Sequence, residues 1–327
     1  MTPALDVARL SVRFPNGLQA VDGLSFRIAP GETLAIVGES GCGKSATALS
    51  IIGLQPEGTQ VGGGIRLDGR ELLGLDRESL RRLRGGAMAM IFQEPMTSLN
   101  PAFPAGEQVA EALLAHESLD QATARRRAVE LLELVRIPDA PRRARQYPHE
   151  MSGGMRQRVM IAMALACRPR LLIADEPTTA LDVTVQAQIL ALLSSLKRET
   201  GTAVLLITHD LGVVADHAQQ VAVMYAGRIV EQAPAERLFA RPEHPYTIGL
   251  LGARPSAAEA TERLASIEGT VPDLRSPPPG CRFAPRCPFR IARCDAEAPA
   301  MRDLGDGHAV ACHRAPLDPA ALGAVAA

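Results

Sequence analysis

The chain has 327 residues, of which 46% are hydrophobic and 22% are charged, and its formal net charge of −1 gives no electrostatic reason to expect a nucleic-acid partner. Its length exceeds that of a typical single domain and suits one large domain with an extension. There is no apolar run near the roughly 18 residues of a membrane span and no signal segment at the N-terminus, so we expect a cytosolic protein.

The first elements in the chain are predicted strands. Residues 4–33 alternate apolar and polar side chains, which predicts short antiparallel strands. Residues 34–37 form an apolar run that predicts a buried strand, and residues 61–75 predict a further hairpin. Phe14 precedes a Pro-Asn-Gly turn and is either a packing residue or a ring that stacks on adenine.

A phosphate-binding loop, G-x-x-x-x-G-K-S, joins the strand at residues 34–37 to a predicted helix. Its glycines let backbone N–H groups turn toward a phosphate without Cβ clashes. Lys44 supplies a charge for the β- and γ-phosphates, and the Ser45 hydroxyl is placed to ligate Mg²⁺. The predicted nucleotide site comprises Gly38, Glu39, Ser40, Gly41, Cys42, Gly43, Lys44, Ser45 and Ala46.

A predicted buried strand at residues 87–92 ends at Gln93, which is either an ordinary polar strand end or a group that reaches a metal or an attacking water. A helical pattern follows from about residue 95 to 165. Within it, Ser152 precedes Gly153 and Gly154 and suits an N-cap. The free amides of that helix end either form an anion site or are simply capped.

Two acidic residues end another predicted strand. Residues 171–174 are continuously apolar, as in a parallel strand buried on both faces, and deliver Asp175 and Glu176 to its C-terminal end. Asp175 can hold a Mg²⁺ shell, and Glu176 can accept a proton from water. The next buried strand, 203–207, leads to His209, a candidate γ-phosphate contact, and residues 221–230 predict a closing hairpin.

Together these motifs resemble the ATP-binding subunits of ABC transporters over roughly residues 5–235. The resemblance implies an α/β P-loop NTPase cassette within residues 1–237, with a mixed sheet core, an antiparallel β subdomain and a helical subdomain at about 95–165. It places Phe14 at the adenine-stacking position. The matching motifs are the Walker A loop (Gly38–Ser45), the Q-loop Gln93, the signature Ser152-Gly153-Gly154, the Walker B pair Asp175-Glu176, the D-loop Asp182 and the switch His209.

The resemblance also implies a mechanism. ATP lies between the Walker A loop of one cassette and the signature of a second, identical or homologous cassette, with Asp182 nearby. Glu176 polarises the attacking water, His209 and Gln93 sense the γ-phosphate, and Lys44 with Mg²⁺ stabilises the transition state. The implied Mg²⁺ ligands are Ser45, Gln93 and Asp175. Two separate membrane-spanning permease subunits are implied partners, with the chain lying peripherally on the cytoplasmic face of the cell membrane.

Residues 238–327 form a predicted C-terminal piece that carries the segment His244-Pro245-Tyr246-Thr247 and most of the cysteines. Four thiolates are enough for tetrahedral Zn²⁺ or an iron–sulfur cluster, and the spacing leaves the metal open, with four unrelated thiols as a third interpretation. His308 and His313 are substitute ligand candidates, whereas Cys42 and Cys167 are interpreted as a loop filler and a core residue. The four clustered cysteines are Cys281, Cys287, Cys294 and Cys312.

This tail resembles the C-terminal region of oligopeptide/dipeptide importer ATPases, and the resemblance implies a [4Fe-4S] cluster on the four cysteines. It implies an ATPase that powers uptake of di- or oligopeptides delivered by an extracytoplasmic binding protein, with residues 94–110 receiving a permease helix. Import of nickel is the alternative within the group. A soluble ABC ATPase of DNA repair or translation is the rival, disfavoured by the single cassette and the absence of a basic surface signal.

Overall fold

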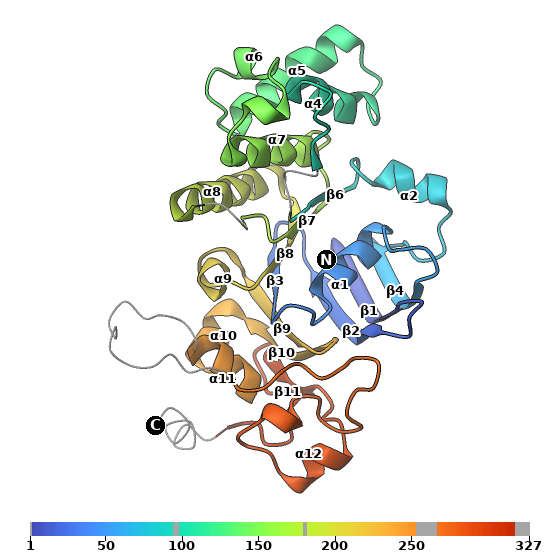
Figure 1. Cartoon of the computed structure of the whole chain (residues 1–327), viewed down its shortest axis with the longest axis vertical. Helices are drawn as coiled ribbons and strands as arrows, with labels where there is room; N and C mark the ends of the chain where they lie inside the picture. The colour runs from blue at the N-terminus through green and yellow to red at the C-terminus, as the bar shows by residue number, and fades with distance from the viewer. Residues whose placement is uncertain (1, 94–97, 179–181, 253–266, 318–327) are drawn as a thin grey trace.

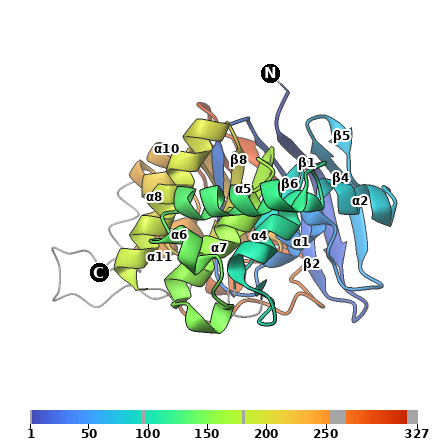
Figure 2. The same ribbon diagram turned by 90° about the horizontal axis from the view of Figure 1, so that it is seen from above.

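The computed structural model describes residues 2–93, 98–178, 182–252 and 267–317. A large mixed sheet occupies the middle of the molecule, a helical subdomain lies at one end, and the C-terminal extension lies at the other (Figure 1). A second, antiparallel sheet lies on one side of the large sheet, and helices α8 and α10 lie on the opposite side (Figure 2).

The large sheet has the strand order β11-β12-β10-β9-β3-β8-β7-β6. Strands β6, β7, β8, β3 and β9 are parallel, and β10 returns antiparallel to β9. Side chains of β3 alternate between two cores: Leu34 and Ile36 face one, whereas Ala35 and Val37 face the other. The strands are β3 (Thr33–Val37), β6 (Met88–Ile91), β7 (Leu171–Asp175), β8 (Ala203–Thr208), β9 (Gln220–Tyr225) and β10 (Arg228–Pro234).

The second sheet confirms the antiparallel strands predicted near the N-terminus. Its order is β2-β1-β4-β5, and it packs over helix α1, which contacts β1 and β2 as well as β6 and β7 of the large sheet. Its elements are β1 (Leu5–Arg13), β2 (Gln19–Ile28), β4 (Gln60–Leu67) and β5 (Arg70–Glu71), with α1 (Lys44–Ile52) and α2 (Arg77–Leu83) beside them.

Helices form the predicted subdomain, in which α4, α5 and α7 pack against one another. Pro141 and Pro148 stand at the starts of short helical segments, where a missing N–H removes no internal hydrogen bond. The subdomain contains α4 (Ala105–Leu114), α5 (Gln121–Leu134), α6 (Ala140–Arg143), the 3₁₀ turn η1 (Pro148–Glu150) and α7 (Gly153–Leu165); α8 (Val183–Thr200) and α9 (Leu211–His217) follow later in the chain.

The C-terminal extension continues the large sheet. Strand β12 pairs with β10 through Glu231 and Val310, and Phe283 belongs to the main core. The extension is therefore packed as part of the cassette, while a domain boundary near residue 237 stays a prediction. Helix α10 (Ala235–Ala240) leads into the extension, whose elements are α11 (Pro245–Gly252), η2 (Ala284–Arg286), α12 (Ala292–Ala296), β11 (Arg302–Asp303) and β12 (Ala309–Val310). Within the described residues, no helix has the length and apolar character needed to span a bilayer.

Candidate functional site

The phosphate loop runs from the end of β3 into α1 and is packed so tightly that two positions require glycine. A Cβ at Gly38 would overlap the carbonyl oxygen of Met224, and one at Gly43 would overlap that of Ala20. Gly43 also has a φ of 107°, which L side chains rarely adopt. The loop is therefore held between strands β2 and β9.

The ammonium group of Lys44 is buried inside this loop, with 6% of the residue exposed. Its Nζ donates hydrogen bonds to the carbonyl oxygens of Gly38 at 2.7 Å and Glu39 at 3.0 Å. A buried cation at the N-terminus of the nine-residue helix α1 gives the loop a positive potential suited to a phosphate group.

Asp175, the last residue of β7, is 5% exposed, and the Ser45 hydroxyl lies close enough to its carboxyl group to affect the pKa of that group. Burial raises the pKa of its carboxyl group, although the Ser45 contact opposes this effect. Its Oδ1 is buried without a hydrogen-bond partner. An orphaned carboxylate oxygen beside a serine hydroxyl fits Mg²⁺, which takes few protein oxygens and completes its shell with water and phosphate.

Glu176 lies where the ends of three parallel strands converge. The side-chain amide of Gln93, after β6, donates a 3.0 Å hydrogen bond to its Oε2, and Nδ1 of His209, after β8, lies 3.3 Å from its Oε1. The backbone of Glu176 has a φ of 47°, a strained conformation of the kind found at functional sites. The structure thus brings together the predicted Gln93, Glu176 and His209. The strained backbone of Glu176 was not predictable from the sequence.

The predicted signature begins helix α7. The Ser152 hydroxyl accepts a hydrogen bond from the N–H of Met155, which confirms the predicted N-cap. Ser152 and Gly153 are exposed, and a Cβ at Gly154 would press on Val185 at the start of α8. Helix α7 lies apart from helix α1, and the phosphate loop is at the start of α1 (Figure 1).

The start of α8 adds to the same exposed surface. The Asp182 carboxylate caps the helix by accepting from the N–H of Val185 at 2.9 Å. Val183 next to it is 82% exposed. The starts of α7 and α8 therefore expose Ser152, Gly153, Asp182 and Val183 together.

Phe14 lies in the loop between β1 and β2, half-buried and packed against the second core. Both interpretations drawn from the sequence are compatible with this position. Stacking on adenine stays a prediction.

The four C-terminal cysteines converge on one small cavity, which His313 also lines. Burial raises the pKa of the Cys281 and Cys312 thiols, and that of Cys287 to about 12. Within the described residues, no three histidine, cysteine, aspartate or glutamate side chains are placed to hold a metal ion. The four thiols thus lie around one cavity but are not arranged as the ligands of a metal ion.

The sequence suggests His308 as a substitute metal ligand, but the structure gives this residue a different role. It is 1% exposed, and its Nε2 lies 2.7 Å from Oε1 of the fully buried Glu231. His313 instead faces the carbonyl oxygen of Glu297 at 2.9 Å through its Nε2.

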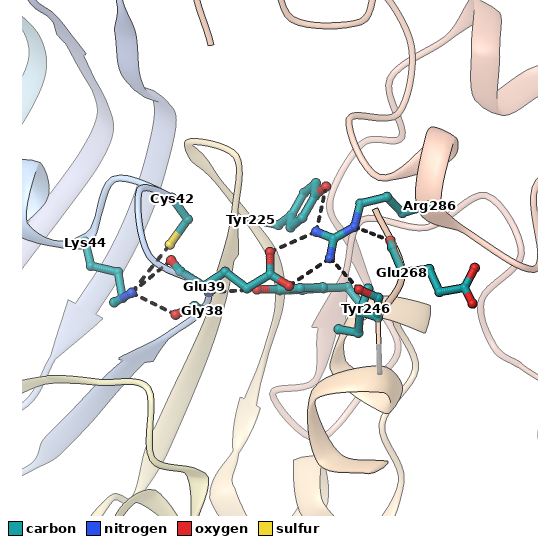
Figure 3. A network of polar contacts seen from close by, with 9 residues as sticks. Gly38, Glu39, Cys42, Lys44, Tyr225, Tyr246, Glu268 and Arg286 are labelled. Carbon is teal, nitrogen blue, oxygen red and sulfur yellow. Dashed lines mark hydrogen bonds and ion pairs between the residues drawn. The ribbon is translucent and has the colours of Figure 1, made fainter. Parts of the chain in front are cut away.

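Sequence reasoning missed a contact between the extension and the phosphate loop. Tyr246 and Arg286 both bind Glu39, more than 200 positions earlier (Figure 3). The only signal in the sequence was the His-Pro-Tyr-Thr segment itself, which the family resemblance flagged without giving it a role.

Comparison with known sequences gives two matching families. Residues 21–179 match the ABC transporter family, and residues 230–294 match the oligopeptide/dipeptide transporter C-terminal region. A probable peptide ABC transporter ATP-binding protein of Sinorhizobium fredii is 55% identical over 95% of this chain and 94% of its own length. The dipeptide transport ATP-binding protein DppD of Bacillus subtilis is 51% identical, with 95% of each chain covered.

Solved structures give the same fold. The ATP-binding cassette MJ0796, in a dimeric post-hydrolysis state bound to ADP and phosphate, matches with a TM-score of 0.64 and 28% identity, over 71% of this chain and 98% of its own. CbiO1 of Clostridium perfringens, part of the transporter complex CbiONQ, also matches with a TM-score of 0.64 and 28% identity, over 73% of this chain and 92% of its own.

Proposed function

Because this chain belongs to the ATP-binding subunits of ABC-type peptide transporters, we propose that it hydrolyses ATP to power the uptake of di- or oligopeptides. One observation carries the hydrolytic part of this proposal. Gln93, Glu176 and His209 meet at the strand ends, and the preceding Asp175 carboxyl group lies close to Ser45 of the phosphate loop.

In this proposal the loop amides and Lys44 bind the phosphates, and the Phe14 ring stacks on the adenine. Mg²⁺, when bound, neutralises charge on the phosphates. Asp175, Ser45 and Gln93 would hold it. Glu176 takes up a proton from the attacking water, and Gln93 and His209 hold its two carboxylate oxygens in place for that transfer.

We propose that a second cassette completes each nucleotide site. Ser152, Gly153 and Asp182 are exposed in this chain, and Val183 beside them is a large apolar side chain in solvent. The dimeric state of the related cassette MJ0796 supports such an arrangement. The signature of a partner would then close over the phosphates bound by this chain.

The proposed membrane partners are two permease subunits, with the chain bound peripherally at the cytoplasmic face and the peptide delivered by an extracytoplasmic binding protein. Phe103 follows the Q-loop and is 54% exposed, and Phe92 is 39% exposed. These rings are candidates for packing against a permease helix. Of the segment predicted to receive it, residues 94–97 lie outside the described residues.

We also propose that Cys281, Cys287, Cys294 and Cys312 are the ligands of a [4Fe-4S] cluster, with Zn²⁺ as the alternative. Their convergence on a single cavity supports the choice of these four thiols. Metal analysis and the visible absorption spectrum of anaerobically purified protein would distinguish the two. A zinc content that outweighs iron would reject the cluster.

The function is tested by trapping the complex. Glu176→Gln protein is expressed with the membrane proteins of its host, extracted in mild detergent with ATP and isolated by affinity, and its partners are identified by mass spectrometry. We expect two multi-span permeases and a cassette, and their loss in the matched Lys44→Ala control, which should not bind ATP. Uptake of a labelled peptide should fail in cells that carry Glu176→Gln as the only copy. Recovery of soluble ribosomal or DNA-bound partners alone would overturn the transport function.

A further inference from the structure

The C-terminal extension binds the phosphate loop at one residue, Glu39. The guanidinium of Arg286 donates to both carboxylate oxygens of Glu39, at 2.8 and 3.0 Å. The phenol oxygen of Tyr246 accepts a hydrogen bond from the backbone N–H of Glu39 at 2.8 Å. Figure 3 shows both side chains reaching Glu39 from the extension. A two-point guanidinium–carboxylate pair fixes orientation as well as distance.

Arg286 is held rigidly before it reaches the loop. Its side chain is 5% exposed, and its other contacts are the carbonyl oxygens of Ile267 and Glu268 and the phenol oxygen of Tyr225. It ends the 3₁₀ turn η2, which is closed by a hydrogen bond from the N–H of Arg286 to the carbonyl of Phe283. A preorganised guanidinium loses little entropy when it forms the pair.

Tyr246 is equally fixed. It is fully buried, and its ring packs against those of Tyr225 and Phe283 at centroid distances of 4.6 and 5.5 Å. Its phenol oxygen therefore has one available position, at the N–H of Glu39. The extension thus supplies two contacts, from Arg286 and Tyr246, to the same loop residue.

Glu39 also connects directly to the phosphate-binding lysine. Its carbonyl oxygen accepts a 3.0 Å hydrogen bond from Lys44 Nζ, while its N–H and carboxylate are bound by the extension. The backbone of the preceding Gly38 lies so close to Met224 that an added Cβ would overlap the carbonyl oxygen of Met224. Consequently, a shift of Glu39 would displace the residues that follow it in the loop. These include Lys44 and the backbone N–H groups that bind phosphate in the proposed function.

We propose that Arg286 and Tyr246 are positioning residues that keep the phosphate loop in its nucleotide-accepting shape, so that the C-terminal extension sets the ATP affinity of this chain. The inference rests on the proposed function, in which this loop binds ATP. It assigns the extension a part in the nucleotide site in addition to its packing on the cassette.

The test measures ATP binding and folding stability separately. Arg286→Met keeps most of the side-chain volume but removes both charged hydrogen bonds, and we expect it to weaken ATP binding about tenfold, as expected for lost hydrogen bonds to a charged group. Arg286→Lys, which keeps the charge, should recover part of this loss. Tyr246→Phe should weaken binding less than Arg286→Met. The dissociation constant for ATP is measured by equilibrium titration in the presence of Mg²⁺, and stability by urea unfolding.

Arg237→Met is the matched control. Arg237 on α10 binds Asp306 and His308 of the extension, and within the part of the chain that the structure describes it forms no hydrogen bond or ion pair with the phosphate loop. It should lower stability without changing ATP affinity. A double-mutant cycle with Glu39→Gln should show that the two changes are not additive, because each removes the same pair.

Two outcomes would overturn the inference: an unchanged ATP dissociation constant in Arg286→Met, or full additivity in the cycle. Equal stability losses in Arg286→Met and Arg237→Met with unchanged binding would mean that the pair serves docking alone. Failure of the unmodified chain to bind ATP would instead reject the proposed function, so the two failures are distinguishable.

Discussion

The amide of Gln93 donates a hydrogen bond of 3.0 Å to the carboxylate of Glu176, across 83 positions of the sequence. Gln93 follows β6 and Glu176 follows β7, and these strands are parallel neighbours. The parallel register therefore brings both strand ends to one edge. His209 completes the arrangement from the end of β8, on the other side of β7.

Glu176→Gln should lower the turnover of ATP at least about 100-fold, because a neutral amide cannot accept the proton of the attacking water. ATP binding should be retained, since the phosphate loop is untouched. Single-turnover hydrolysis and ATP titration of the same preparation check this. If binding were lost in proportion to turnover, Glu176 would be positioning the nucleotide and would not be acting as the base.

Gly43→Ala should abolish ATP binding. The new Cβ would overlap the carbonyl oxygen of Ala20, so the loop has to move. Gly17→Ala is the matched control, because Gly17 also has a positive φ, 82°, but no atom within 4 Å of the added Cβ. The control should cost only about 1–2 kcal/mol of stability from backbone strain and leave binding intact. Equal effects of the two variants on ATP titration would mean that strain, and not the close approach, demands glycine at position 43.

The cassette was predictable from the sequence because its signals are local. Apolar runs predicted the buried strands, and the predicted Gln93, Glu176 and His209 each lie within two residues of a strand end. Parallel pairing then brings these residues together without further information. The Ser152 cap was predictable for the same reason, since a cap needs only its own helix.

The contacts of the extension were not predictable in this way. Arg286 and Glu39 meet across 247 positions, and nothing near either residue encodes the other. His308 illustrates the limit: its place beside Cys312 suggested a metal ligand, whereas the fold pairs it with the buried Glu231. Sequence proximity cannot reveal a partner that lies on a distant strand.

Glu231→Ala should lower the free energy of unfolding by about 3 kcal/mol or more, because it leaves buried polar groups without a partner. The Glu231 carboxylate accepts from the N–H of Glu243 at 2.6 Å and that of His244 at 3.0 Å, and it binds His308. Urea unfolding measures the loss. Glu236→Ala, on the exposed side of α10, is the control and should change stability by less than about 0.5 kcal/mol. Similar losses of unfolding free energy in the two variants would show that the Glu231 hydrogen bonds make no net contribution to stability.

The stability of the chain should fall on acidification because of His244. This residue is 1% exposed, and burial lowers its pKa to about 3, whereas a histidine in the unfolded chain titrates near pH 6.5. Between these values the unfolded chain binds a proton that the folded chain does not. His244 therefore lowers the free energy of unfolding by up to about 1.4 kcal/mol per pH unit below pH 6.5, and its contribution is constant above that pH.

His244→Asn isolates this effect. Nδ1 of His244 accepts a hydrogen bond from the N–H of Tyr246 at 3.1 Å, and an asparagine oxygen can take a similar position without titrating. Urea unfolding at pH 7.5 and pH 5.5 should show a smaller loss of stability on acidification for His244→Asn than for the unmodified chain. Exposed His149 supplies the control, His149→Asn. If His244→Asn and His149→Asn changed the pH dependence equally, the buried histidine would not be its source.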